Sequence, residues 1–111
     1  MKNILFCLPF IFSCGDKSSN VNYKEMLENG GLIIDVRSES EFSSGNIKSS
    51  LNIPLDKLLS NISQLEDNNQ PIITCCASGM RSEKAKKILI KNGYKNVVNG
   101  GGWKSLRDNL K

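Results

Sequence analysis

Short apolar runs alternate along this chain with segments whose apolar residues recur at helical spacing. One of these runs, residues 72–75, leads through a short loop into a clear amphipathic segment at residues 81–92. A continuous apolar run of this length is typical of a strand that is buried on both faces. Strands that alternate with helices pack as a parallel sheet covered by helices. We therefore expect a small three-layer α/β domain, with a mainly parallel sheet and helices on both faces.

Residue spacing predicts where these elements begin and end. Strands are expected at residues 32–35, 51–54, 71–75 and 94–98. Helices are expected at residues 23–29, 40–44, 56–65, 81–92 and 103–110. The short helix at 40–44 is supported by Ser38 and Glu41, which have the spacing of a capping box. Residues 99–102, Asn-Gly-Gly-Gly, are expected to form a turn, and all these elements fit in one domain at residues 22–111.

The first residues differ in composition from that domain. A short basic start precedes an apolar run at residues 4–12, which is too short to span a bilayer and suits an export signal. Residues 11–14, Ile-Phe-Ser-Cys, resemble the cleavage site of a bacterial lipoprotein signal. The resemblance implies a signal peptide at residues 1–13, a lipidated Cys14 and a polar tether within residues 14–21. The protein would then be exported and lipid-anchored in the bacterial cell envelope; an ordinary secretory signal is the alternative.

Composition excludes several kinds of chemistry. The sequence has no histidine, so it can build neither a Ser-His-Asp or Cys-His arrangement nor a histidine-ligated zinc or haem site. Catalysis would have to use cysteine, carboxylate, arginine or the backbone. The formal net charge of +4 is small and spread along the chain, which does not indicate nucleic-acid binding. We expect no metal, no other cofactor and a monomeric protein.

One loop falls where parallel α/β sheets bind their ligands, beyond the carboxyl end of a strand. It runs from Cys76 to Ser82 and leads directly into the clearest helix. Backbone N–H groups at such a junction point at one spot, and the small residues Ala77, Ser78 and Gly79 let the chain curl around it. The thiol of Cys76 would lie inside this loop, so its pKa should fall well below that of a free cysteine. A nucleophile can therefore form here without a histidine base.

The same loop carries a family pattern. Cys-x-x-Gly-x-Arg-Ser is met by Cys76, Gly79, Arg81 and Ser82. Further family elements follow the expected order along the chain: Asp35-Val36-Arg37, Glu41-Phe42, Asn52-Ile53-Pro54, Gly93-Tyr94 and Gly101-Gly102. From about residue 23 to residue 111 the chain thus resembles a rhodanese domain. The likeness is to small, single-domain, exported thiosulfate sulfurtransferases of that family.

The resemblance implies a double displacement. The Cys76 thiolate would take the outer sulfur of thiosulfate, or of a similar small sulfur-containing anion, and pass it from a persulfide to cyanide or a thiol. Arg81 would attract the dianionic donor. The other substrate-binding residues implied are those of the loop: Ala77, Ser78, Gly79 and Met80. Asp35, Arg37 and Ser82 are expected to support the site, the first two as an ion pair.

The sequence departs from the family pattern in three places. Gly45-Asn46-Ile47 stands where the family commonly has Gly-His-Ile, and Ser49-Ser50 replaces the usual Gly-Ala. Both changes are expected to affect the local backbone more than the chemistry. Met80 occupies a loop position that is often polar, and this change would alter the choice of substrate.

Cys75 leaves two other interpretations open. Counted from Cys75, the segment reads Cys-x5-Arg-Ser, the spacing of cysteine-dependent phosphatases and some arsenate reductases. Gly79, three residues after Cys76, favours the rhodanese register, and Thr74 stands where those phosphatases usually have histidine. A redox or non-catalytic domain with a Cys75–Cys76 pair is the other alternative. A buried structural role for Cys75 is the simplest interpretation.

Overall fold

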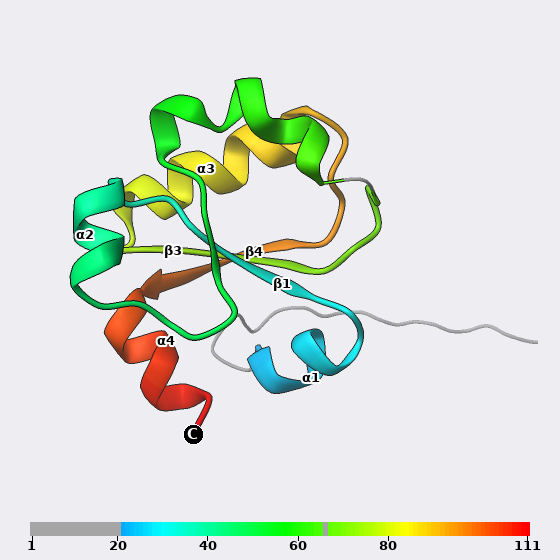
Figure 1. The fold of residues 1–111 in the computed structure, drawn as a ribbon. Helices are drawn as coiled ribbons and strands as arrows, with labels where there is room; N and C mark the ends of the chain where they lie inside the picture. The colour runs from blue at the N-terminus through cyan, green and yellow to red at the C-terminus, as the bar shows by residue number, and fades with distance from the viewer. Residues whose placement is uncertain (1–20, 66) are drawn as a thin grey trace, which may run out of the picture.

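Four parallel strands form a single sheet in the computed structural model, which describes residues 21–65 and 67–111 (Figure 1). The strands are β1 (Leu32–Asp35), β2 (Leu51–Asn52), β3 (Ile72–Cys76) and β4 (Val97–Gly102), in the order β2-β1-β3-β4. Strand β3 lies between β1 and β4, and all of its residues are buried. The expected parallel sheet is confirmed. The predicted signal peptide, Cys14 and the tether up to residue 20 lie outside the described residues.

Helices cover both faces of this sheet, as a three-layer domain requires. They are α1 (Tyr23–Glu28), α2 (Glu39–Ser44), α3 (Met80–Lys91), α4 (Trp103–Asn109) and the 3-10 helices η3 (Leu55–Lys57) and η4 (Leu59–Gln64). Helix α3 lies with η3 and η4 on one face, while α1 and α4 lie on the other (Figure 1). Helix α2 begins with the predicted capping box, in which Ser38 and Glu41 each bind the other's backbone N–H.

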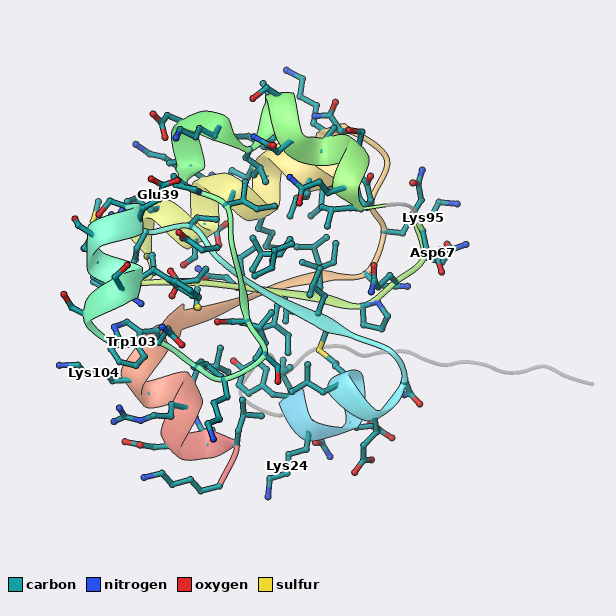
Figure 2. The ribbon with its side chains drawn as sticks, viewed as in Figure 1. Lys24, Glu39, Asp67, Lys95, Trp103 and Lys104 are labelled. Atoms are coloured by element: carbon teal, nitrogen blue, oxygen red, sulfur yellow. The ribbon has the colours of Figure 1, made fainter. Side chains whose placement is uncertain are left out.

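Two apolar cores result, because successive residues of a strand point to opposite faces of the sheet. Ile34, Ile72 and Cys76 pack on the α3 side. Ile33, Ile73 and Cys75 pack on the α1 and α4 side. Charged side chains such as Lys24, Asp67 and Lys95 point outward from this layered interior (Figure 2). The adjacent cysteines are thus assigned to different layers of the molecule.

The prediction of an α-helix at residues 56–65 is wrong, because two 3-10 helices occupy this segment. The side chains of Ser60 and Asn61 both donate to the backbone carbonyl of Lys57 and so compete with regular α-helical bonding. The tighter turns bury Leu58 completely and leave Leu59 exposed. An apolar stripe that looks helical in the sequence is therefore divided between the core and the surface.

The last strand is also displaced from its predicted position. It begins at Val97 and includes all four residues predicted as a turn. A Cβ on Gly100 would lie 2.7 Å from Ile73 Cγ2 and 3.0 Å from Leu106 Cδ2. The glycines therefore let β4 and α4 approach β3 closely, which is a packing role that local turn propensity does not reveal.

Candidate active site

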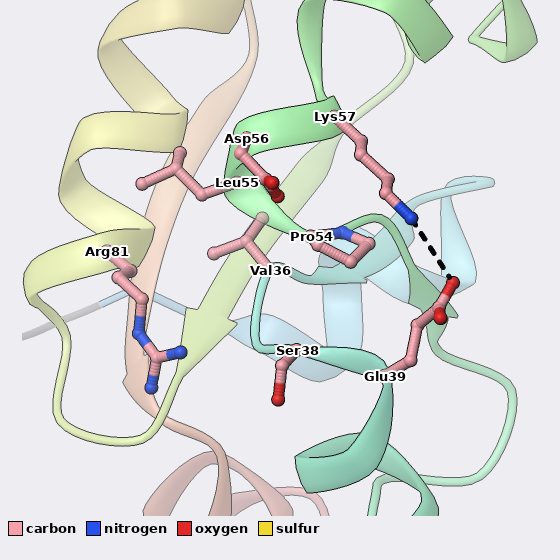
Figure 3. A pocket seen from close by; sticks show the side chains of 8 residues that line it. All are labelled: Val36, Ser38, Glu39, Pro54, Leu55, Asp56, Lys57 and Arg81. Carbon is pink, nitrogen blue, oxygen red and sulfur yellow. Dashed lines mark ion pairs between the residues drawn. The ribbon is translucent and has the colours of Figure 1, made fainter.

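A shallow cavity opens at the carboxyl edge of the sheet, where ligands bind in parallel α/β domains. Its volume is about 510 Å³. Apolar Val36, Pro54 and Leu55 line it together with Arg81 from the start of α3 (Figure 3). A 3.7 Å ion pair between Lys57 and Glu39 lies on another side. This cavity gives a small molecule access to the Arg81 side of the loop that follows β3.

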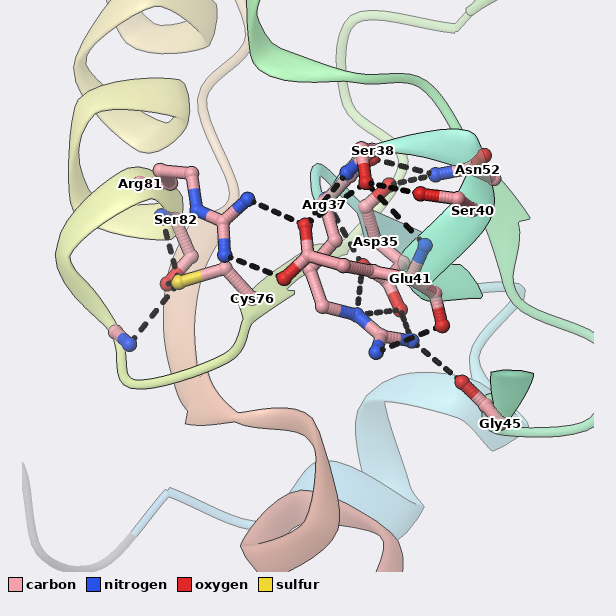
Figure 4. A network of polar contacts seen from close by, with 11 residues as sticks. Asp35, Arg37, Ser38, Ser40, Glu41, Gly45, Asn52, Cys76, Arg81 and Ser82 are labelled. Atoms are coloured by element: carbon pink, nitrogen blue, oxygen red, sulfur yellow. Dashed lines mark hydrogen bonds and ion pairs between the residues drawn. The ribbon is translucent and has the colours of Figure 1, made fainter. Parts of the chain in front are cut away.

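That loop holds the thiol of Cys76 at its centre. Cys76 is the last residue of β3, and Gly79, with a φ of +107°, turns the chain into α3. The backbone N–H of Gly79 lies 3.0 Å from Cys76 Sγ, and that of Ser82 lies 3.3 Å from it. The hydroxyl of Ser82 is 3.4 Å from the same sulfur (Figure 4). Two backbone N–H groups thus donate to one sulfur atom, as the loop sequence predicts, and a hydroxyl lies beside it.

These contacts favour the ionised form of Cys76. Burial opposes ionisation, but hydrogen bonds from the Ser82 hydroxyl and from the backbone N–H groups of Ser82, Gly79 and Ser78 outweigh it. The pKa of the Cys76 thiol is therefore lowered from its ordinary value. A thiolate in this loop can act as a nucleophile, and the loop can then hold the anion that the reaction forms.

Cys75 has the opposite environment. Its side chain is fully buried in the layer of α1 and α4. Burial, with a smaller contribution from the nearby negative charge of Asp35, raises the pKa of the Cys75 thiol to about 12. The structure therefore places Cys75 where the simplest sequence interpretation puts it, away from the loop.

The predicted pair of Asp35 and Arg37 forms a buried ion pair beneath the site. Arg37 Nη2 lies 2.8 Å from Asp35 Oδ2, and both side chains are almost inaccessible. Arg37 also donates to the carbonyl oxygens of Glu41 and Gly45, and its guanidinium lies 4.6 Å from the Trp103 ring centroid. One arginine thereby fixes β1, α2 and α4 relative to one another.

Arg81 has a partner that the sequence did not reveal. Its Nη1 lies 2.8 Å from Glu41 Oε1, and both side chains are partly exposed (Figure 4). The hydrogen bond from Arg81, aided by the N-cap contacts of Ser38, lowers the pKa of Glu41 to about 2. From its spacing in the sequence, Glu41 is expected only to cap a helix and to belong to the family pattern. In the fold it holds Arg81 in the first turn of α3, so the charge of Arg81 is partly balanced before any substrate arrives.

A second residue that the sequence does not indicate is Asn99, which lies in β4 and not in the predicted turn. Its Oδ1 lies 2.7 Å from the Ser82 hydroxyl, which in turn contacts Cys76. No local signal in the sequence singles out Asn99. The remaining predicted loop residues are partly or largely exposed around the site, and Met80 is 74% exposed. The structure therefore gathers Cys76, Arg81 and Ser82 with two residues that were not predicted to contact them.

Residues 21–65 and 67–111 contain neither a cluster of metal ligands nor a membrane-spanning helix. Within that part of the chain, no three histidine, cysteine or acidic side chains lie together as metal ligands could. None of the helices described there has the length and apolar character needed to cross a membrane.

Comparison with known proteins agrees with this geometry. Residues 19–109 match the rhodanese-like domain family. The thiosulfate sulfurtransferase PspE of Escherichia coli (strain K12) is 34% identical over 74 residues, covering 66% of this chain and 71% of that protein. A solved structure described as rhodanese with anions from E. coli has a TM-score of 0.64 and 33% identity, covering 68% of this chain and 89% of the other.

Another relative is a longer protein whose name describes a different activity. The tRNA uridine(34) hydroxylase of Buchnera aphidicola subsp. Baizongia pistaciae (strain Bp) is 33% identical over 120 residues. The match covers 96% of this chain but 38% of that hydroxylase. This chain therefore spans well under half the length of that relative.

Proposed function

This chain belongs to the rhodanese-like domain family, and from that premise we propose that it is a sulfurtransferase. It moves sulfane sulfur from thiosulfate, or a similar small sulfur-containing anion, to cyanide or a thiol through a persulfide on Cys76. One observation carries the proposal: Cys76 Sγ lies 3.0 Å from the Gly79 N–H and 3.3 Å from the Ser82 N–H. A sulfur atom in this position is stabilised as an anion, and Arg81, five residues further along the same loop, lines the neighbouring cavity.

The reaction proceeds in two displacements. The Cys76 thiolate attacks the outer sulfur of the donor, the S–S bond of the donor breaks, and sulfite leaves with the bonding electrons. The acceptor then attacks the outer sulfur of the persulfide, and Cys76 leaves as a thiolate. The negative charge stays within the loop in both half-reactions, where the N–H groups of Gly79 and Ser82 can bind it.

The two alternatives that use Cys75 have less support. A phosphatase or arsenate reductase would need the thiol of Cys75 inside the loop, but this side chain packs on the opposite face of the sheet. A redox pair would need Cys75 and Cys76 to turn toward each other, whereas consecutive strand residues point apart. The buried, protonated state of Cys75 also disfavours both roles.

Intact mass spectrometry after thiosulfate treatment tests the proposal. The wild-type protein and Cys75→Ser should each gain the mass of one sulfur atom, and cyanide should remove it. The Cys76→Ser protein should gain none, because the only thiolate in the loop is lost. An adduct that depends on Cys75, or phosphatase turnover without any adduct, would contradict the proposal.

We also propose that the chain is exported and anchored in the bacterial cell envelope through a lipidated Cys14. The support is the sequence alone: an apolar run that ends in Ile11-Phe12-Ser13-Cys14 and a polar segment after it. Metabolic labelling with a fatty acid in cells should mark the wild-type protein and not Cys14→Ser. A Cys7→Ser protein is the matched control and should stay labelled. Equal labelling of the Cys14→Ser protein would exclude the anchor.

A further inference from the structure

The carboxamide of Asn99 is engaged at both ends, which fixes its orientation. Its Nδ2 donates to the carbonyl oxygen of Gly79 and to Glu83 Oε1, each at 3.1 Å. Its Oδ1 accepts from the backbone N–H of Gly101 at 2.8 Å. A carbonyl oxygen can only accept and a backbone N–H can only donate, so a flipped amide would lose these bonds. The oxygen of Asn99 is therefore the atom that faces Ser82.

This orientation decides where the proton of Ser82 points. The Ser82 hydroxyl has one proton, and Asn99 Oδ1 can only accept, so Ser82 donates across their 2.7 Å contact. The hydroxyl oxygen then presents a lone pair to Cys76 Sγ, 3.4 Å away. In that arrangement the donor of the Cys76–Ser82 contact is the S–H group. The Ser82 hydroxyl can stabilise a thiolate only after its proton turns from Asn99 to the sulfur.

We propose that Asn99 is a positioning residue that competes with Cys76 for the proton of Ser82 and thereby limits ionisation of the thiol. The hydroxyl proton lies on the Asn99 side when Cys76 is a thiol and turns to the sulfur when Cys76 is a thiolate. The turn is a rotation about one side-chain bond, so no proton is gained or lost. The bond from Gly101 keeps Asn99 Oδ1 paired while Ser82 is turned away.

The same rotation of the Ser82 proton serves both halves of the reaction. This part of the inference rests on the proposed sulfurtransferase function. In the persulfide the negative charge moves to the outer sulfur, about 2 Å from Cys76 Sγ. The inner sulfur then needs no donor, and the proton of Ser82 returns to Asn99. Ser82 can therefore help Cys76 to leave as a thiolate without holding the proton on the sulfur throughout the cycle.

Of the charged groups around Cys76, only Glu83 contacts Asn99 directly. Those that face the thiol or its hydrogen-bond partners from the packed elements are Arg81 and Glu83 on α3, Glu41 on α2, and Asp35 and Arg37 beside β1. Each acidic member has a donor in the structure, and none bonds to the Ser82 hydroxyl. Cys75 faces the other layer. Removing Asn99 leaves the surrounding ion pairs unchanged but also removes the donor of Glu83. That second effect is common to proteins with and without the Ser82 hydroxyl, so the difference between the two backgrounds reports the effect that passes through Ser82.

A double-mutant cycle on the full chain tests the proposal. The pKa of Cys76 is measured from the pH dependence of its alkylation by iodoacetamide in the wild type, Asn99→Ala, Ser82→Ala and the double variant. Asn99→Ala should lower that pKa by about 0.5 to 1 pH unit, because the Ser82 proton becomes free for the thiolate. In the Ser82→Ala background the same substitution should shift the pKa by less than about 0.2 units. Asn96→Ala, on an exposed asparagine of the segment before β4, is the matched control and should shift nothing.

Two outcomes would overturn the proposal. One is an equal shift in both backgrounds, and the other is a pKa that rises when Asn99 is replaced. If Asn99→Ala fails to fold, Asn99→Ser answers the same question, because serine can still accept from Gly101 but is too short to reach Ser82. Alkylation needs no sulfur donor, so a negative result here leaves the sulfur-adduct test of the proposed function untouched, and the reverse also holds.

Discussion

Replacing Cys76 with serine is expected to lower the rate of sulfur transfer from thiosulfate to cyanide by at least about a thousandfold. Serine has nearly the same volume and can accept from the N–H groups of Gly79 and Ser82, so the loop should keep its shape. Its hydroxyl cannot form the stable persulfide on which the reaction depends, and it ionises far less readily than a thiol. Steady-state formation of thiocyanate measures the loss.

The matched control is Cys75→Ser, because it removes a thiol of the same strand that packs on the other face. This variant should keep the rate within about threefold of wild type if the fold is maintained. In the wild type the rate of the first displacement should rise with pH as the thiolate forms. Its midpoint should lie below the ordinary pKa of cysteine, because the loop lowers the pKa of Cys76. A rate that depends on Cys75, or that still rises toward pH 12, would contradict this assignment.

Replacing Arg37 with methionine is expected to lower the free energy of unfolding by about 3 to 5 kcal/mol. Removal of the guanidinium leaves the carboxylate of Asp35 buried without its 2.8 Å partner. The carbonyl oxygens of Glu41 and Gly45 also lose a donor. An unpaired buried charge cannot be compensated by the methionine side chain. Chemical denaturation monitored by circular dichroism measures the change.

Lys57→Met is the matched control, because Lys57 forms a 3.7 Å ion pair with Glu39 in which both side chains are exposed. This control should cost less than about 1 kcal/mol. A double variant, Asp35→Leu with Arg37→Met, should be more stable than Arg37→Met alone, because no charge then remains buried. The interpretation fails if Arg37→Met is no more destabilising than Lys57→Met.

The buried ion pair also links stability to the site. Arg37 binds two carbonyl oxygens of α2 and its C-terminal turn, and α2 carries Glu41. Glu41 in turn holds Arg81 at the start of α3. Loss of Arg37 should therefore disturb the position of Arg81 as well as the fold. The Asp-x-Arg element of the sequence thus acts on the active loop through a helix, not through contact with the sulfur.

Much of the site follows from the sequence because its causes are local. The capping box of Ser38 and Glu41 involves residues three apart, and the Cys76 loop is built from consecutive residues. The strand before the loop is apolar except for Thr74 and is buried as predicted. Strand geometry then separates Cys75 from Cys76 by the alternation of side chains alone. The parallel sheet, the helical layers and the identity of the candidate nucleophile were accessible from these patterns.

Which distant residues act on that nucleophile depends on tertiary packing. Arg81 and Glu41 lie 40 residues apart, and Ser82 and Asn99 lie 17 residues apart. Their contacts depend on how α2 and β4 pack against α3, and β4 reaches its place only because Gly100 leaves room for Ile73 and Leu106. Local spacing specifies backbone conformation and the direction of each side chain. The partner of a side chain is specified by packing between elements, which depends on the volumes and positions of residues far away in the chain.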